Sequence, residues 1–137
     1  MTTGPRPFET TWLPEDFVPA PDGSEIRPLL ELAGGSMAHC TLPPGAVALA
    51  VRHATVEELW YVLEGTGEVA RRQGEREEVV AVGAGACVSI PLGTSFQFRA
   101  TGEGPLRLVL VTMPPWPGEH EARRAPDVWP PTVDAEP

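Results

Sequence analysis

Two side chains that could transfer protons or bind a metal ion, His53 and Glu58, lie close together in the middle of the sequence. Imidazole and carboxylate groups bind first-row transition metals, and the same pair can act as base and acid. A carboxyl group buried beside a histidine would have a perturbed pKa, which suits proton transfer. The structural alternative is a buried, neutral His53 hydrogen-bonded to Glu58. Of the other histidines, His39 lies in an apolar run and His120 in a charged tail.

The composition excludes several kinds of chemistry. All ten basic residues other than histidine are arginines, which rules out lysine Schiff-base catalysis and the lysine-containing phosphate loop. A formal charge of −9 over 137 residues argues against a nucleic-acid or anionic-membrane surface. No apolar run is long enough to cross a membrane, and no signal peptide is recognisable, so we expect a cytoplasmic protein. The partner expected for such a chain is a small molecule or another protein.

The elements that must position His53 and Glu58 lie between two proline-rich ends. Thirteen of the 17 prolines fall in the first 28 or the last 25 residues, and proline is excluded from central strands. The predicted parts are an N-terminal extension at 1–25, a barrel at 26–113 and a C-terminal segment at 114–137. Both ends contain tryptophan, and we expect them to pack on the barrel or on a second subunit. The tryptophans concerned are Trp12, Trp116 and Trp129.

The middle of the chain shows almost no helical periodicity. Short β-like runs recur about every ten residues, with glycine and proline turns between them. The runs are 26–32, 37–42, 47–53, 59–63, 68–73, 78–82, 86–90, 96–100 and 106–112. Such spacing predicts an all-β sandwich or barrel. The two cysteines, Cys40 and Cys87, lie in apolar runs and are expected to be buried, free thiols.

Two motifs make this prediction more specific. The first, in residues 45–65, has its fixed positions at Gly45, His53, Glu58 and Gly65. The second, in residues 85–96, has Gly85, Pro91 and Gly93 and ends on Phe96. Together they resemble the two motifs of the cupin superfamily, and residues 112–118 are similar to the ends of functionally uncharacterised small bacterial members.

The resemblance implies a double-stranded β-helix, or jelly-roll barrel, with a small-molecule site inside one end. In metal-binding cupins, three histidines and the motif glutamate hold a divalent ion, often iron, manganese, nickel or zinc. Carried over position by position, His53 and Glu58 are retained, whereas Val51 and Phe96 stand in place of two histidines. Two ligands fall short of the three or four that hold a metal tightly. We therefore expect a degenerate metal site.

One further residue could complete the metal site. The run 37–42 is expected to pair with 47–53 as a hairpin through the turn at 43–45. In one register His39 lies opposite Val51 and faces the same way as His53. His39, His53 and Glu58 would then form a set of two histidines and one carboxylate.

Apolar side chains near His53 are candidates for the wall of a ligand pocket. Phe96 and Phe98 are one strand period apart, and Trp60 and Val62 follow Glu58 on the same face of a regular strand. Tyr61 would then face outward. The expected pocket residues are Val51, Trp60, Val62, Phe96 and Phe98. For Phe96 and Phe98, ordinary core filling is an equally good interpretation.

Three functions remain open from the sequence. The preferred one is a small-molecule-binding cupin with a degenerate metal site, whose catalytic activity is undecided. The second is a metal-dependent dioxygenase or isomerase using His53, Glu58 and His39. The third is a metal-free epimerase or isomerase with His53 as base. The resemblance and the tryptophan-containing ends also imply a homodimer.

Overall fold

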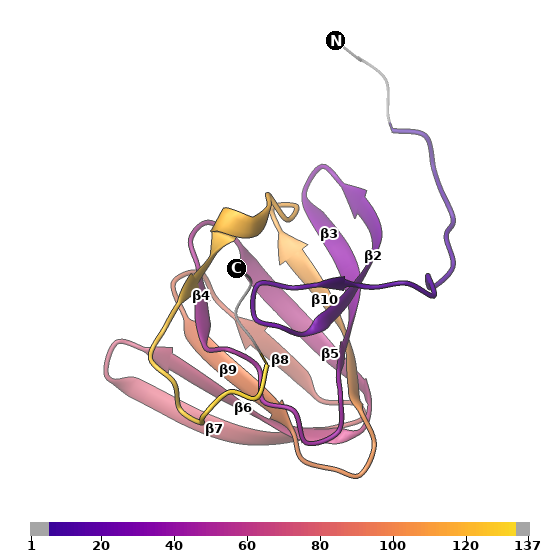
Figure 1. The fold of residues 1–137 in the computed structure, drawn as a ribbon. Coiled ribbons are helices and arrows are strands. Elements are labelled where there is room, and N and C mark those ends of the chain that lie inside the picture. The colour runs from indigo at the N-terminus through magenta and orange to yellow at the C-terminus, as the bar shows by residue number, and fades with distance from the viewer. Residues whose placement is uncertain (1–5, 134–137) are drawn as a thin grey trace.

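The computed structural model describes residues 6–133 and forms a double-stranded β-helix of two facing antiparallel sheets, as predicted (Figure 1). The six-stranded sheet has the order β1 (Val18–Pro19), β2 (Glu25–Leu32), β3 (Gly35–Leu42), β10 (Leu106–Met113), β5 (Glu57–Glu64), β8 (Cys87–Ile90). The five-stranded sheet has the order β11 (Ala122–Arg124), β4 (Val51–His53), β9 (Ser95–Ala100), β6 (Thr66–Gln73), β7 (Arg76–Gly83). Within residues 6–133 the one helix is a single 3₁₀ turn, η1 (Glu119–Glu121). No helix among these residues is long and apolar enough to span a membrane.

Strand β5 shows how the sequence pattern directs side chains into the barrel. Successive side chains of a strand point to opposite faces. Glu58, Trp60 and Val62 are accordingly buried, whereas the side chain of Tyr61 is exposed on the outer face. The predicted orientations of Trp60, Val62 and Tyr61 are therefore confirmed.

The predicted hairpin between 37–42 and 47–53 is wrong. β3 pairs with β2 and β10, whereas β4 lies in the other sheet and pairs with β9 and β11. Residues 43–50 carry the chain from one sheet to the other, and Val47 already forms a bridge with Arg99 of β9. The two prolines that begin this crossing have no N–H group to donate to a hairpin ladder.

The barrel interior is packed with aromatic and aliphatic side chains. The Trp60 ring meets Phe96 and Phe98 edge to face, at centroid distances of 5.4 and 5.1 Å. Such pairs add to the stabilisation from burial of the rings. Cys40 belongs to this core, but Cys87 is exposed, contrary to the prediction, because it points outward from the edge strand β8.

The C-terminal segment, as far as residue 133, folds along the five-stranded sheet. β11 pairs with β4, and farther on the buried Gln97 side chain holds the backbone of the segment. The Gln97 amide donates to the carbonyls of Ala48 and Trp129 and accepts from the N–H groups of Val128 and Trp129. Arg99 also lies 4.3 Å from the Trp129 ring centre. The expected packing of this tryptophan on the barrel is thus observed.

We expect Gln97→Met to lower the free energy of unfolding by about 2 kcal/mol, because it leaves the buried Ala48 carbonyl and partly buried backbone groups of the C-terminal segment without partners. Gln73→Met is the matched control, since the Gln73 amide makes one hydrogen bond, to Thr94. Urea unfolding of both variants measures the difference. An equal, small effect in the two variants would contradict the role assigned to Gln97.

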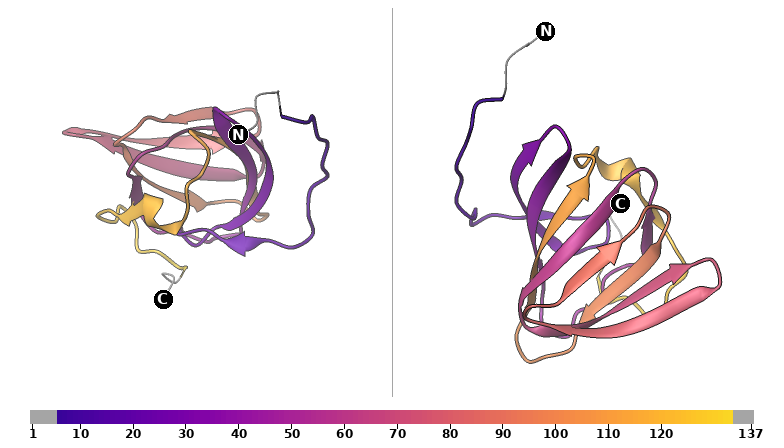
Figure 2. Two further views of the ribbon diagram at one scale, coloured as in Figure 1. Left: turned by 90° about the horizontal axis from the view of Figure 1, so that it is seen from above. Right: turned by 180° about the vertical axis from the view of Figure 1, so that it is seen from behind.

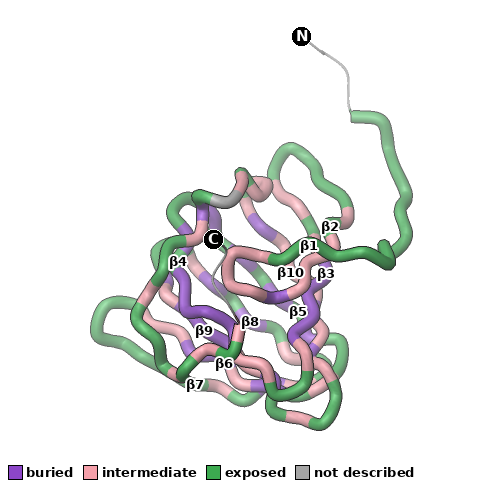
Figure 3. Tube along the Cα trace, viewed as in Figure 1, coloured by how far each residue is buried: buried purple, intermediate pink, exposed green. Residues whose placement is uncertain are grey.

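The N-terminal segment differs from the C-terminal one. Between Arg6 and Phe17 every residue is exposed, and the chain runs away from the barrel (Figures 2 and 3). Trp12 therefore packs on no part of its own chain among the described residues. The terminal residues 1–5 and 134–137 of the predicted extensions lie outside the described residues.

Candidate functional site

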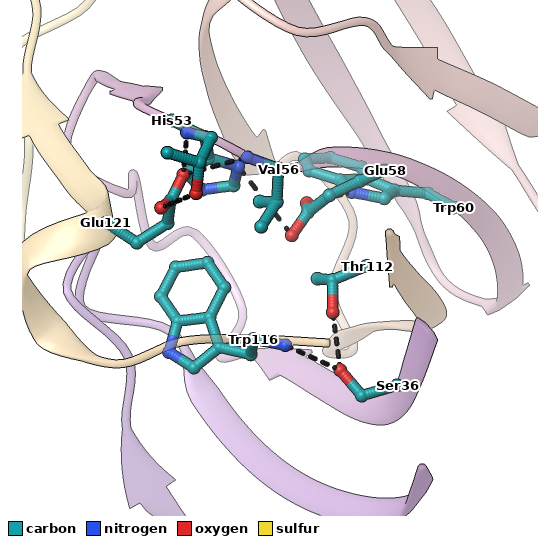
Figure 4. Close-up of polar contacts among 9 residues, drawn as sticks. Ser36, His53, Val56, Glu58, Trp60, Thr112, Trp116 and Glu121 are labelled. Carbon is teal, nitrogen blue, oxygen red and sulfur yellow. Dashed lines mark hydrogen bonds and ion pairs between the residues drawn. The ribbon is translucent and has the colours of Figure 1, made fainter. Parts of the chain in front are cut away.

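His53 and Glu58 meet at one end of the barrel, where they come from opposite sheets (Figure 4). Glu58 lies near the start of β5, and its cross-strand neighbour on β10 is Thr112. Thr112 in turn lies opposite Ser36 of β3, and the two hydroxyl groups are 2.5 Å apart. His53 ends β4, with Ala122 of β11 beside it. The row Ser36–Thr112–Glu58 thus faces His53 across the barrel end.

The two side chains lie close together without a direct hydrogen bond. His53 Nδ1 is 3.8 Å from Glu58 Oε2. This nitrogen is buried and has no hydrogen-bond partner among the described residues. The other carboxyl oxygen, Glu58 Oε1, accepts a hydrogen bond from the Trp60 indole at 2.8 Å. We considered above a buried, neutral His53 that is hydrogen-bonded to Glu58. The structure contains no such hydrogen bond.

Burial makes both groups favour their neutral forms. Burial lowers the pKa of His53 to about 4, although the nearby Glu121 carboxylate opposes this. Burial raises the pKa of Glu58 to about 7, against the hydrogen bond from Trp60. Between these two pKa values the pair is an imidazole facing a carboxylic acid, not an ion pair. Near neutral pH Glu58 is the group that exchanges a proton.

Aromatic rings enclose His53 on two sides. Phe96 meets it edge to face at 5.1 Å, and Trp116 does so at 5.2 Å. Trp116 belongs to the C-terminal segment, and its backbone N–H donates to the Ser36 hydroxyl at 3.0 Å. This segment therefore crosses the barrel end, with the indole ring of Trp116 against His53 and its backbone N–H on Ser36 (Figure 4).

Glu121 is a site residue that the sequence did not reveal. Its buried carboxylate accepts hydrogen bonds from the Thr55 hydroxyl and from the N–H groups of Thr55 and Val56. Burial alone would raise the pKa of Glu121, but these hydrogen bonds outweigh it and lower the pKa. The carboxylate thus fixes the loop between His53 and Glu58. It lies outside both motifs, so no spacing pointed to it.

The residues present do not fit a tightly bound metal ion. Within residues 6–133 no three His, Cys, Asp or Glu side chains come together as a possible site. The predicted third ligand, His39, is placed between Arg27 of β2 and Val109 of β10, on the outer face of the six-stranded sheet. That position follows from the failed hairpin, because β3 and β4 do not pair. His53 and Glu58 are left as two donors, below the usual number.

The five expected pocket residues all belong to the packed core. Val51, Trp60, Val62, Phe96 and Phe98 are buried to 3% exposure or less. A cavity of about 190 Å³ lies elsewhere, beside Arg71, Arg76 and Glu78. A pocket wall formed by these five residues stays a prediction. At the barrel end, by contrast, the buried His53 Nδ1 has no hydrogen-bond partner among the described residues.

Comparisons with known proteins agree with this fold. The family described as "Cupin domain" matches residues 38–112. The uncharacterised protein MJ1618 of Methanocaldococcus jannaschii is 34% identical over 105 residues, covering 73% of this chain and 79% of that protein. The structure of BH2720 from Bacillus halodurans has a TM-score of 0.63 at 24% identity, covering 74% of this chain and 76% of that one. For KdgF from Halomonas sp. the TM-score is 0.63 at 18% identity, with coverages of 76% and 94%.

Proposed function

This chain belongs to the cupin family, and on that premise we propose that it binds a small molecule directly, without a metal ion, at the barrel end between His53 and Glu58. The observation that carries the proposal is the buried His53 Nδ1, which has no partner among the described residues and lies 3.8 Å from Glu58 Oε2. A buried polar atom without a partner costs free energy, and a ligand that satisfies it recovers that cost. The site of a small molecule would thus coincide with two retained motif residues.

The chemistry of this corner indicates the class of ligand. A neutral imidazole and a carboxylic acid can each donate or accept, so one hydroxyl or carbonyl group between them would bond to both. The rings of Phe96 and Trp116 next to His53 favour an apolar portion beside that group. An anion is disfavoured, because the Glu121 carboxylate lies near His53 and the chain has a net charge of −9. The ligand is therefore a small, neutral molecule that has one polar group next to an apolar one.

We expect phenol and cyclohexanol to raise the melting temperature, and benzoate to raise it far less. A ligand that binds only the native state must stabilise it. His53→Leu should abolish the stabilisation, whereas Tyr61→Phe, which changes an outward-facing ring, should retain it. Differential scanning fluorimetry at matched probe concentrations measures each shift. Equal stabilisation of wild type and His53→Leu by the two alcohols would refute a site at His53.

The metal content of the purified wild-type protein tests whether the site works without a metal ion. Elemental analysis after purification without added ions should find far less than one iron, manganese, nickel or zinc atom per chain. Adding these ions should not raise the melting temperature, because two donors hold a metal weakly. A stoichiometric metal that is lost in His53→Ala would overturn the proposal and favour a metal-dependent enzyme.

A second candidate function is metal-free proton transfer on the bound molecule. It is favoured by the pKa of Glu58, raised to about 7 by burial, because a general acid or base works best near its own pKa. The outward-facing Tyr61 is no partner for His53, so Glu58 would be the proton-exchanging group. Deuterium incorporation from solvent into a bound ketone such as cyclohexanone, lost in Glu58→Gln, would support catalysis. If the wild type incorporates no deuterium, catalysis is refuted and the protein only binds the molecule.

A further inference from the structure

The hairpin of β6 and β7 projects to one side of the barrel and carries two arginine side chains on one of its faces (Figures 1 and 2). A turn at 74–75 joins the strands, and its glycine has the positive φ that a two-residue turn requires. Arg71 is the cross-strand partner of Glu78, and Gln73 is the partner of Arg76. Because alternate residues of a strand share a face, these four side chains lie on the same side of the hairpin.

The strand β8 and the turn after it form a wall opposite this face. Arg71 Nη1 donates to the carbonyl of Ser89 in β8 at 3.0 Å, which joins the two sheets. Beyond β8, the N–H group of Thr94 donates to the carbonyl of Pro91 at 3.1 Å and closes a turn. Between the hairpin face and this wall lies the cavity of about 190 Å³, here called the arginine pocket. It is lined by Arg71, Gln73, Arg76 and Glu78 on one side and by Ser89, Pro91 and Thr94 on the other.

The arginine pocket has an excess of positive charge. Its two guanidinium groups share one carboxylate, that of Glu78. Arg71 Nη2 donates to Glu78 Oε1 at 2.8 Å, whereas Arg76 Nη2 is 3.9 Å from Glu78 Oε2, beyond the length of a hydrogen bond. The neighbouring carboxylates of Glu75 and Glu77 do not line the pocket. A chain with a net charge of −9 thus places an uncompensated positive charge at this position.

The pocket also has hydrogen-bond donors that remain available. A guanidinium group has more N–H donors than the hydrogen bonds from Arg71 to Ser89 and Glu78 use. The Thr94 side chain is buried, and its hydroxyl accepts a hydrogen bond from the Gln73 amide at 3.0 Å. A hydroxyl that accepts in this way still has its own proton to donate. Donors from two strands and from a buried threonine therefore line one small cavity.

The opposite face of the same hairpin carries an ordinary surface ion pair. Arg72 and Glu77 are cross-strand partners there, and Arg72 Nη2 is 3.1 Å from Glu77 Oε1. That pair has one charge of each sign, as a solvated salt bridge requires. The pocket face instead has two arginines for one carboxylate. A salt bridge within the hairpin therefore accounts for Arg71 but not for Arg76.

We propose that the arginine pocket binds a phosphate group, either as the free ion or as part of a small molecule. Guanidinium groups are well suited to phosphate in both charge and geometry. The tetrahedral phosphate presents oxygens in several directions, so it can accept from both arginines and from Thr94 at once, which a planar carboxylate does less well. The volume of about 190 Å³ is below the roughly 300 Å³ of pockets for drug-sized ligands, so the molecule is small. No residue of this pocket is His53 or Glu58, so the site is separate from the one proposed at the barrel end.

Titration of the wild-type chain with inorganic phosphate, followed by ¹H–¹⁵N NMR, tests the proposal. Phosphate replaces sodium chloride so that the ionic strength stays constant. The backbone amide signals of Ser89 and Thr94 should shift and reach saturation at millimolar phosphate, and that of Tyr61, on the outer face of the other sheet, should not shift. The absence of a saturable shift at Ser89 and Thr94 would overturn the proposal. So would the same shifts on titration with sodium chloride alone.

Two arginine variants then test which guanidinium groups bind the phosphate. Arg76→Gln should weaken phosphate binding by about tenfold or more, because it removes charge-assisted hydrogen bonds. The Arg76 side chain is 79% exposed, so this substitution leaves the fold intact. Arg72→Gln is the matched control, since Arg72 is on the same hairpin but on its other face, and the affinity should change by about twofold or less. Equal losses in the two variants, or no loss in Arg76→Gln, would contradict the assignment.

Two more measurements identify the source of the phosphate and separate this site from the barrel end. Glycerol 3-phosphate that binds more tightly than inorganic phosphate would support a small phosphorylated molecule as the occupant, and weaker binding would support the free ion. His53→Leu should bind phosphate as tightly as wild type, and Arg76→Gln should still be stabilised by phenol. If His53→Leu lost phosphate binding, the phosphate would occupy the barrel end, and the assignment to the arginine pocket would be wrong.

Discussion

Glu58→Gln is expected to stabilise the protein by about 3 kcal/mol at pH 8.5 relative to wild type and by little at pH 4. The pKa of Glu58 rises from 4.5 to about 7 in the native state because the carboxyl group is buried. A group with a raised native pKa stabilises the fold fully below its unfolded pKa, and this stabilisation is lost as the pH rises through the native pKa. The interval from 4.5 to about 7 corresponds to about 3 kcal/mol. Glutamine cannot ionise, so the variant avoids this loss.

Urea unfolding at several pH values measures this difference directly. In Glu58→Gln the amide oxygen of the new side chain can still accept the hydrogen bond from the Trp60 indole, so packing should change little. Glu57→Gln is the control, because Glu57 is the preceding residue but points outward into solvent. Comparing the two variants separates the effect of burial at Glu58 from the general effect of replacing a glutamate by glutamine in β5. A constant difference between Glu58→Gln and wild type from pH 4 to 8.5 would show that Glu58 titrates normally.

The expected gain also bears on function. A buried carboxyl group such as that of Glu58, whose ionisation destabilises the fold, brings no benefit to stability. A glutamine would serve the fold better at neutral pH. Residues that lower stability in this way occur at binding and catalytic sites, where their chemistry is used. This argument supports Glu58 as part of a ligand site independently of the family motif.

The sequence predicted the fold well because its local signals were consistent. Turn residues about every ten positions marked nine of the strands, and the motifs identified the barrel. Alternation along β5 correctly placed Trp60 and Val62 inside and Tyr61 outside. The failed hairpin and the misplaced His39 were questions of long-range geometry, whereas Cys87 was misjudged because it takes the outward position in the alternation of β8. Whether residues 43–50 form a hairpin or cross between sheets depends on the whole barrel, and the position of His39 depended on that choice.

The candidate site was predicted only in part, for a similar reason. His53 and Glu58 lie within a motif, so their spacing identified them. Trp116 and Glu121 come from the proline-rich end, more than 50 residues along the chain. Nothing local to Glu121 indicates that its carboxylate accepts hydrogen bonds from Thr55 and Val56. The residues that the C-terminal segment contributes to the site could be identified only from the structure.

The stability of His53→Leu, relative to wild type, should change with pH in the opposite direction to that of Glu58→Gln. Burial lowers the pKa of His53 from 6.5 to about 4. A group with a lowered native pKa stabilises the fold above its unfolded pKa, and this stabilisation is lost as the pH falls through the native pKa. For His53 the loss amounts to about 3 kcal/mol between pH 6.5 and 4. Over most of the same interval Glu58 contributes a gain of similar size, so in the wild type the two contributions nearly cancel.

Removing either partner should therefore expose the contribution of the other. As the pH falls from 6.5 to 4.5, Glu58→Gln should lose stability relative to wild type, and His53→Leu should gain it. Because each slope is read within one variant, the packing cost of the substitution cancels. The double variant should return to the wild-type slope, since it lacks both contributions, which are opposite in sign and similar in size. Parallel slopes for wild type and both single variants would contradict the neutral imidazole–carboxylic acid pair on which the proposed ligand class rests.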